Sequence, residues 1–353
     1  MSQNSTTDFA DQLLGWYDQN RRSLPWRAEG SARPDPYLVW LSEIMLQQTT
    51  VATVKNRFNR FLATWPTVQA LAAADQADVL SAWAGLGYYA RARNLHKCAR
   101  TVAHELDGAF PSTAKALEKL PGVGAYTASA VAAIAFGESV AVVDANVERI
   151  ISRTERISTP LPGAKKAIYA ALEPLVPATR PGDFAQALMD LGASICSPRS
   201  PACERCPVQR FCGACGAGDM ERYPVKPAIK TRPVRRITAF ALLRGDTVLL
   251  QRRPERGLLG GTLGLPSTPW QEADDFPGDN TVKAHAPLDA AWQEAGTAPR
   301  HTFTHFHLET RLLRAHLNEE ISLDGFEWHK NTDALAASLP TVFRKMLLTL
   351  KKG

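Results

Sequence analysis

The chain has 353 residues and a net charge of +6. At this length we expect about two domains, each able to bury its own core. No apolar run reaches the roughly 20 residues of a membrane span, and the N-terminus lacks the charged-then-apolar pattern of a signal peptide. These features argue against a membrane or exported protein and predict a soluble, cytoplasmic one.

The first 225 residues are rich in alanine and show helical periodicity without strand alternation. We expect helices over residues 8–20, 37–47, 51–65, 70–84, 89–106, 114–120, 127–136, 147–153, 164–175 and 182–195. Thr49 or Thr50 is expected to cap the third of these. Residues 1–225 are therefore predicted to form one all-α domain.

Glu43 is the one acid in the expected helix 37–47, whose other residues are mostly apolar. Burying an ionised carboxylate without a partner is unfavourable, so burial would raise its pKa and make it a proton donor near neutral pH. The alternative is an exposed acid on an apolar helix, and this segment alone favours neither.

A Gly-rich hairpin follows the expected helix 114–120 and contains Pro121, Gly122, Val123 and Gly124. Proline fixes one φ angle and the two glycines permit positive φ, so the amides of a tight loop could point at one DNA phosphate. An ordinary helix-turn-helix corner is the alternative. The order of helix, hairpin, small-residue helix and aspartate resembles the helix-hairpin-helix DNA glycosylases.

The aspartate in this order is Asp144, which directly precedes the expected helix 147–153. Capping that helix is its ordinary role, and it is compatible with catalysis because a capping carboxylate stays ionised and can face a developing cation. A proton-donating acid with an ionised partner cleaves glycosidic bonds through oxocarbenium-like transition states. An N-glycosidic bond requires the same two roles.

Four cysteines lie close together with the spacing C-x6-C-x2-C-x5-C: Cys196, Cys203, Cys206 and Cys212. An extracellular disulfide framework is not expected in so long a chain without a signal sequence. Zinc sites usually separate two close pairs by a longer insert, so the spacing favours a cubane iron–sulfur cluster and leaves zinc as the alternative. Cys98 is expected in the core, and Cys215 has no evident partner.

Residues 226–236 form a basic, proline-containing segment with five Lys or Arg and no acid. Such a segment is typical of a linker that lies against phosphates, and a solvated connector is equally compatible with it. From residue 237 the pattern changes to a β-hairpin over 237–243 and 247–251. An extended run over 302–317 and helices within 334–350 complete a predicted α+β domain, residues 237–353.

Two segments, Trp40 to Thr49 and Gly85 to Leu95, together with the cysteine cluster, resemble the MutY adenine DNA glycosylases over roughly residues 8 to 350. The resemblance implies a 4Fe-4S cluster of structural role on the loop 196–212. It also implies that Glu43 protonates the departing adenine and that Asp144 stabilises the sugar cation, with Tyr126 and Asn146 in support.

Two positions bear on the chemistry that the resemblance implies. In the related endonuclease III group, a lysine in the place of Tyr126 forms a Schiff base and cuts the strand, so tyrosine predicts a monofunctional glycosylase. Ala145 stands where the family has glycine. Alanine tolerates positive φ poorly, so we expect a slightly different turn and the same chemistry.

The resemblance also identifies residues that would bind the substrate. The positions of the family's adenine pocket are occupied here by Trp26, Arg27, Leu46 and Gln186. Gln48 and Tyr88 match the wedge that offsets the unstacking of a flipped base. The ordinary role of an adjacent pair such as Tyr88 and Tyr89 is core packing, which remains the alternative.

The segment 257–266 resembles the start of a Nudix fold, but the acidic metal-binding helix of that fold does not follow, so pyrophosphohydrolase activity is not expected. In MutY proteins this domain recognises 8-oxoguanine through a Phe-Ser-His loop. Phe303, Thr304 and His305 occupy that place. Threonine keeps the hydroxyl of the family's serine and adds a methyl group, so we expect 8-oxoguanine recognition to be kept with an altered binding affinity. A plain strand, or a metal site that adds His301 and His307 to His305, is the alternative.

Together these inferences predict a monomeric, DNA-associated base-excision repair enzyme. Its substrate would be double-stranded DNA with adenine opposite 8-oxoguanine or guanine, and its partners an abasic-site endonuclease and a sliding clamp. The alternatives are an endonuclease III-like glycosylase/lyase for oxidised pyrimidines and an iron–sulfur DNA-binding redox sensor. Tyr126 argues against the first, and the pairing of Glu43 with Asp144 argues against the second.

Overall fold

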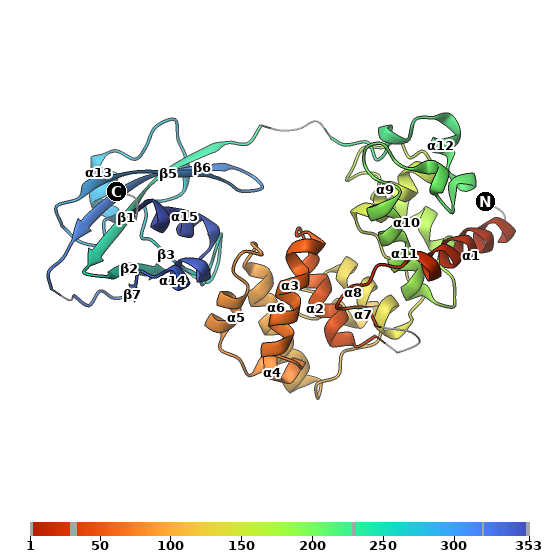
Figure 1. The fold of residues 1–353 in the computed structure, drawn as a ribbon, viewed down its shortest axis with the longest axis horizontal. Helices are drawn as coiled ribbons and strands as arrows, with labels where there is room; N and C mark the ends of the chain where they lie inside the picture. The colour runs from red at the N-terminus through yellow and green to blue at the C-terminus, as the bar shows by residue number, and fades with distance from the viewer. Residues whose placement is uncertain (1–2, 29–33, 228–230, 320, 351–353) are drawn as a thin grey trace. The chain divides into compact units, whose positions relative to one another are not determined.

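The computed structural model describes residues 3–28, 34–227, 231–319 and 321–350 (Figure 1). The chain divides into two compact units, Met1–Ala73 with Asn94–Ile229 and Ala74–Arg93 with Lys230–Gly353. Within the described ranges, no helix combines the length and apolarity that a membrane crossing requires.

The described part of residues 1–225 is helical, as the periodicity predicts. Its main helices are α1 (Gln3–Asn20), α2 (Pro36–Leu46), α3 (Val51–Thr64), α4 (Val68–Ala72), α5 (Gln76–Ala82), α6 (Ala90–Glu105), α7 (Ala114–Leu117), α8 (Ala125–Val131), α9 (Ala145–Thr154), α10 (Lys165–Leu172), α11 (Pro181–Ser194) and α12 (Gly213–Ala217). A π-helix, η1 (Ala132–Phe136), continues α8, and a short 3₁₀ turn, η2 (Glu173–Leu175), continues α10. Short 3₁₀ turns η3 (Cys203–Arg205), η4 (Gln209–Phe211) and η5 (Met220–Arg222) surround α12.

Two helices differ from the prediction. The helix expected over 70–84 is broken into α4 and α5, because Thr67 caps the first and Asp75 stands in extended backbone at the start of the second. The helix expected over 127–136 changes to π geometry at Ala132 and ends at Gly137, whose φ is +74°. Thr50 is the cap of α3, since its hydroxyl accepts the Thr53 amide.

The core around α11 positions the site. This helix packs on α1, α9 and η1, and Phe9 and Phe184 meet edge to face with ring centroids 6.4 Å apart. Two glycines let its neighbours approach: a Cβ on Gly182 would lie 2.6 Å from the Ala133 carbonyl oxygen, and one on Gly192 would lie 2.5 Å from Asn146 Cβ. The first turn of α9 is thereby held against α11.

The second unit contains a seven-stranded mixed sheet. Its strands are β1 (Val234–Arg244), β2 (Thr247–Arg252), β3 (Leu263–Gly264), β4 (Gln271–Glu272), β5 (Gln293–Thr302), β6 (His307–His316) and β7 (Phe326–Lys330). The order is β3-β2-β1-β6-β5, with β4 paired to β1 and β7 to β2. Strands β1 and β6 are parallel, and the predicted β1–β2 hairpin is confirmed.

Alternating side chains of β1 face two helical layers. Ile237 and Ala239 belong to the core that includes Phe343 of α15 (Thr341–Leu350). Phe240 points the other way, onto Val282 of α13 (Asp279–His285). A further helix, α14 (Asp333–Ser338), precedes α15. Helices thus pack on both faces of the sheet, each face burying its own apolar side chains.

The boundary of the expected linker needs correction. β1 begins at Val234, so Arg235 and Arg236 are strand residues, and the Arg236 guanidinium pairs with Glu309 at 2.9 Å. Residues 228–230, in the middle of that linker, lie outside the described residues. Pairing with β4 and β6 recruits this basic end of the segment into the sheet, so only its first part can act as a connector.

Candidate active site

The Glu43 carboxyl group lies in the wall of a cavity, on α2, and the residue is only 6% exposed. The Tyr126 hydroxyl, from the first turn of α8, donates a hydrogen bond to Glu43 Oε2 at 2.7 Å. Burial raises the pKa of Glu43 to about 7; the Tyr126 hydrogen bond and the charge of Arg27 oppose that rise, and the charge of Asp144 adds to it. Near neutral pH the group can therefore still hold a proton to donate.

Asp144 is the N-cap of α9, as its place in the sequence predicts. Its Oδ1 accepts from the amides of Asn146 and Val147 at 2.9 and 2.8 Å, and its Oδ2 accepts from Asn146 Nδ2 at 2.8 Å. Ala145 is the first helical residue, so this position needs no left-handed backbone. Alanine is therefore under no backbone strain at this position, and a turn that differs from the family's stays a prediction.

Two arginines connect α9 to the cysteine segment, and the sequence analysis did not find them. Arg149 donates to Asn146 Oδ1 at 2.9 Å and to the Cys196 carbonyl at 2.7 Å. Arg153, one turn further on, donates to Cys196 Sγ at 3.1 Å. The i, i+3 and i+4 spacing of Asn146, Arg149 and Arg153 puts them on one helix face, which is the signal that could have indicated the connection.

One cavity of the helical unit is lined by all four predicted adenine-pocket residues and by Glu43. It is lined by Trp26, Arg27, Glu43, Leu46 and Gln186, together with Arg22, Leu24, Val39, Ser42, Val51, Ile134 and Met189. Trp26 is held edge to face on Phe58, with ring centroids 5.4 Å apart. Ile134 comes from the π-helix η1, so the irregular turn supplies part of the wall.

Asp190 fixes the arginines of this cavity and was also missed. Its carboxylate accepts hydrogen bonds from both terminal nitrogens of Arg27, at 2.7 and 2.8 Å, and from Arg22 Nε at 2.6 Å. Its side chain is 1% exposed. Burial alone would raise the pKa of Asp190, but the hydrogen bonds and charges of the two arginines hold it below its ordinary value. Asp190 lies one turn after Gln186 on α11, so both face the same side.

The Gly-rich hairpin differs from the expectation at one glycine. Gly122 has φ +73°, and a Cβ there would lie 2.4 Å from Asn94 Cβ. Gly124 is the extended N-cap of α8, with φ −89°, so only Gly122 uses positive φ. No other heavy atom lies within 4 Å of the place of a Gly124 Cβ, and no side chain among the described residues caps the helix. The amides of this helix start are thus accessible to an anion.

Gln48 and Tyr88 both have left-handed backbone, with φ of 54° and 49°. For residues other than glycine this conformation costs on the order of 1 kcal/mol and is concentrated at functional sites. Both side chains are exposed, Tyr88 by 43%. Tyr89 is only 3% exposed, so the core-packing alternative applies to Tyr89 and not to Tyr88.

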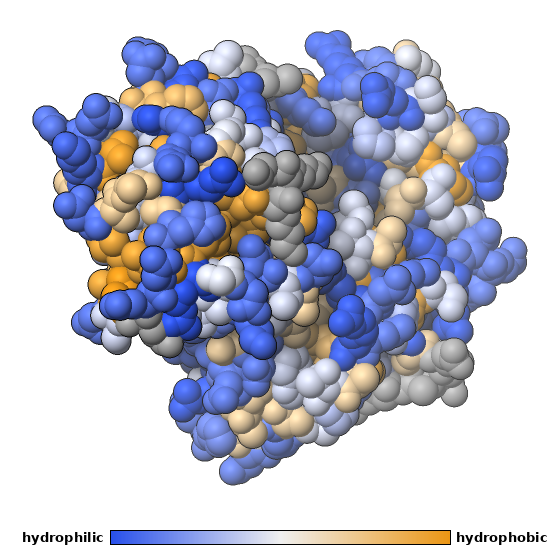
Figure 2. Space-filling view, turned by 60° about the vertical axis from the view of Figure 1, so that its left-hand side comes forward, coloured by the Kyte–Doolittle hydropathy of each residue, from blue (hydrophilic) through white to orange (hydrophobic). Residues whose placement is uncertain are grey.

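Most of the face in Figure 2 is hydrophilic, with hydrophobic residues in separate patches.

The four predicted ligand cysteines line one small cavity, and Cys215 lies there with them. Cys203 lies in η3, Cys206 and Cys212 directly follow η3 and η4, and Cys215 lies in α12. Arg153 donates to the Cys196 sulfur in this cavity. No three His, Cys, Asp or Glu side chains in the described ranges are spaced to hold a single ion. An iron–sulfur cluster is wider than a single metal ion and binds one thiolate at each iron. Four thiols around one cavity, with the Arg153 guanidinium as a hydrogen-bond donor to one of them, therefore fit such a cluster.

In the second unit, the loop between β5 and β6 carries Phe303, Thr304 and His305. The Phe303 ring stacks on Phe306 with centroids 4.7 Å apart, while Thr304 and His305 are exposed. His301 packs edge to face on Phe303 at 4.5 Å. The loop is thus a turn anchored by one aromatic stack, with its polar residues at the tip. This corrects the single extended run expected over 302–317.

Models of known families match three parts of the chain. These are the HhH-GPD superfamily base excision DNA repair proteins over residues 41–177, the iron–sulfur binding domain of endonuclease III over 196–212 and the NUDIX domain over 238–349. A thermostable thymine-DNA glycosylase has a similar structure, with a TM-score of 0.54 and 33% identity over 61% of this chain and 98% of that one. An endonuclease III in a non-covalent DNA complex shares the fold at 21% identity and a TM-score of 0.51, covering 62% of this chain and 98% of that one. Fold and site define a helix-hairpin-helix base excision DNA repair enzyme with an iron–sulfur segment and a Nudix-like domain.

Similar sequences narrow this class. The adenine DNA glycosylase of Homo sapiens is 34% identical over 96% of this chain and 73% of its own length. That of Buchnera aphidicola subsp. Acyrthosiphon pisum is 32% identical over 98% of both chains. The protein belongs to the adenine DNA glycosylase family.

Proposed function

We propose that this protein hydrolyses the N-glycosidic bond of adenine opposite 8-oxoguanine or guanine in double-stranded DNA and leaves an abasic site. Family membership supports the adenine glycosylase activity. The observation that carries the residue assignments is the buried Glu43, hydrogen-bonded to Tyr126 and set in the wall of the cavity that contains Trp26 and Arg27.

Glu43 is proposed to donate its proton to a ring nitrogen of the flipped adenine. Because the Tyr126 hydroxyl donates its hydrogen bond to Glu43 Oε2, we assign the acidic proton of Glu43 to Oε1. Protonation lets adenine leave as a neutral base while positive charge develops on the sugar. Asp144, a carboxylate that accepts three N–H hydrogen bonds from α9, would stabilise that charge and help to place the attacking water. The water adds its oxygen to C1′, and the proton that it loses goes to the Glu43 carboxylate formed in the first step, which restores the acid.

Tyr126 also sets the outcome after base release. A lyase forms a Schiff base between an amine and the sugar, and a phenol cannot do this. Burial and the neighbouring Glu43 raise the pKa of Tyr126 well above its ordinary value, so it stays a hydrogen-bond donor. We infer a monofunctional glycosylase.

Base flipping and lesion recognition are assigned to exposed residues. The strained, exposed Gln48 and Tyr88 support a role as the wedge that replaces the flipped base. The accessible amides at Gly124 support phosphate binding by the hairpin. The exposed Thr304 and His305, above the Phe303 stack, support 8-oxoguanine recognition by hydrogen bonds.

The iron–sulfur group is assigned to the 4Fe-4S type, held by Cys196, Cys203, Cys206 and Cys212. When bound, it would hold the loop 196–212 together, while Arg149 and Arg153 link that loop to α9, and it would supply no step of the hydrolysis. The division into a glycosylase domain over 1–225 and a lesion-recognition domain remains a proposal, with the start of the second domain moved from 237 to β1, at Val234, and the connector ending before it.

The experiment is single-turnover incubation of the protein with a duplex that contains one adenine opposite 8-oxoguanine. We expect free adenine, and strand breakage only after alkali. A parallel duplex with thymine glycol tests the endonuclease III-like alternative. Cleavage of that strand without alkali, with adenine retained in the first duplex, would overturn both the substrate and the role of Tyr126.

A further inference from the structure

A fifth thiol shares the cavity of the four proposed ligand cysteines. Cys215 lies on α12, three residues after Cys212, and lines that cavity with Cys196, Cys203 and Cys206. The spacing C-x6-C-x2-C-x5-C ends at Cys212, so neither the cysteine pattern nor the matched segment 196–212 assigns a role to Cys215.

Cys215 is placed beside one ligand in particular. Its side chain and that of Cys203 line the same cavity and interact directly. Its backbone amide donates to the Cys212 sulfur, and Gln209 Nε2 donates to Cys215 Sγ at 3.6 Å. Burial raises the pKa of the Cys206 thiol, and the strongest other influences on it come from Val208 and the other three proposed ligands rather than from Cys215, in contrast to Cys203.

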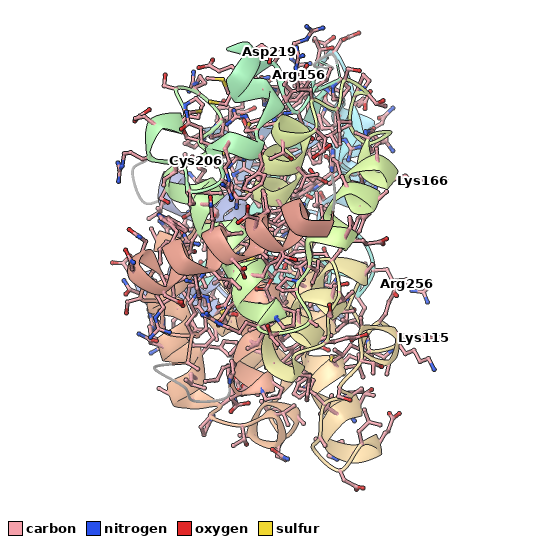
Figure 3. All side chains as sticks on the ribbon, turned by 90° about the vertical axis from the view of Figure 1, so that its right-hand side faces the viewer. Lys115, Arg156, Lys166, Cys206, Asp219 and Arg256 are labelled. Carbon is pink, nitrogen blue, oxygen red and sulfur yellow. The ribbon has the colours of Figure 1, made fainter. Side chains whose placement is uncertain are left out.

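The scaffold, rather than Cys203, holds Cys215 toward the cavity. A Cβ on Gly213, at the start of α12, would lie 3.0 Å from the Thr154 carbonyl oxygen, so α12 packs directly on the end of α9. Arg156, just after α9, pairs with Asp219, just after α12, at 2.8 Å. Figure 3 labels Arg156 and Asp219 next to each other, and Cys206 on the green ribbon that also carries Asp219. Removing the Cys203 thiol would therefore leave Cys215 in place.

We propose that Cys215 is a reserve ligand of the iron–sulfur group and can take the place of Cys203. The proposal rests on the four-cysteine assignment above. In the exchange, the Cys215 thiol loses its proton and its sulfur bonds to iron, while the iron–sulfur bond of Cys203 breaks and that sulfur takes up a proton. No atom changes oxidation state, so no oxidant or reductant is required.

The test compares iron content and visible absorption of full-length variants purified with the group in place. We expect Cys203→Ala to keep at least half of the wild-type iron, and Cys206→Ala to lose it at least fivefold. The double variant Cys203→Ala/Cys215→Ala should lose iron as Cys206→Ala does. Equal loss in Cys203→Ala and Cys206→Ala, or a double variant that retains iron, would overturn the proposal.

A second measurement keeps all four ligands and so does not depend on a ligand variant folding. Iron release to a chelator is followed in wild type, in Cys215→Ala and in the control Cys98→Ala, whose cysteine is buried in α6. We expect release from Cys215→Ala to be several-fold faster than from the other two, because a transiently broken Cys203 bond is no longer replaced. Equal rates would contradict the proposal. Wild-type protein that binds no iron–sulfur group would instead refute the four-cysteine assignment itself.

Discussion

Replacing Tyr126 with phenylalanine tests the proton-donor role of Glu43 through its pH dependence. The Tyr126 hydroxyl donates to Glu43 Oε2 at 2.7 Å and lowers the pKa of Glu43 against the opposing effect of burial. Removing this donor favours the neutral acid, so the pKa should rise from about 7. A hydrogen bond to a charged group contributes about 1.5 to 3 kcal/mol, which corresponds to at least about one pH unit.

The magnitude appears in the ratio of base-release rates at two pH values. If the protonated form is active, an acid with a pKa of about 7 gives a rate about tenfold higher at pH 6 than at pH 8. A rise of about one unit reduces that ratio to about twofold. Both enzymes are therefore assayed under single-turnover conditions from pH 5 to pH 9. A Tyr126→Phe profile that moves to lower pH, or a wild-type rate that increases with pH, would refute the reasoning.

Three further variants test separate parts of the site. Glu43→Gln should be more stable than wild type at pH 8 by roughly 3 kcal/mol. The pKa of Glu43 rises from 4.5 to about 7 on folding, so the wild type loses stability as the pH increases from 4.5 to 7 and the glutamine variant does not. Urea unfolding of both proteins at pH 4 and pH 8 checks this, and a difference in stability that is equal at the two pH values contradicts it. Asp190→Asn should slow adenine release at least tenfold by loosening Arg27, with DNA binding kept; unchanged release would show that Arg27 is held otherwise. Gly122→Ala should lose about 1 to 3 kcal/mol of stability and bind DNA more weakly, because its Cβ would meet Asn94 at a φ of +73°; a wild-type melting temperature and affinity would contradict this.

Local patterns in the sequence predicted most of the helical unit. Apolar periodicity located the main helices. For the single acid in 37–47 it left a buried and an exposed side chain equally open, and the structure shows the buried one with a raised pKa. The break between α4 and α5 was missed because alanine-rich sequence continues through it, and only the extended backbone at Asp75 ends the pattern. Strand β5 was missed because its side chains are polar and mostly exposed, and two irregularities interrupt its pairing with β6.

The parts of the site that sequence did not predict depend on contacts between distant segments. Arg22 and Asp190 are 168 residues apart in the chain, and no local pattern shows that their side chains meet. Arg149 and Cys196 are joined in the same way across α9 and α11. The helical spacing of Asn146, Arg149 and Arg153 shows that they share a face but not which distant residue they meet, whereas apolar periodicity indicates a buried face directly.

The central claim is that Glu43 supplies the proton for adenine release. The most direct measurement is single-turnover base release by Glu43→Gln beside its affinity for the same duplex with adenine opposite 8-oxoguanine. Glutamine keeps the size of the side chain and cannot donate a carboxylic proton. The account predicts that base release falls at least a thousandfold while affinity stays within a few-fold of wild type. Base release near the wild-type rate would contradict it.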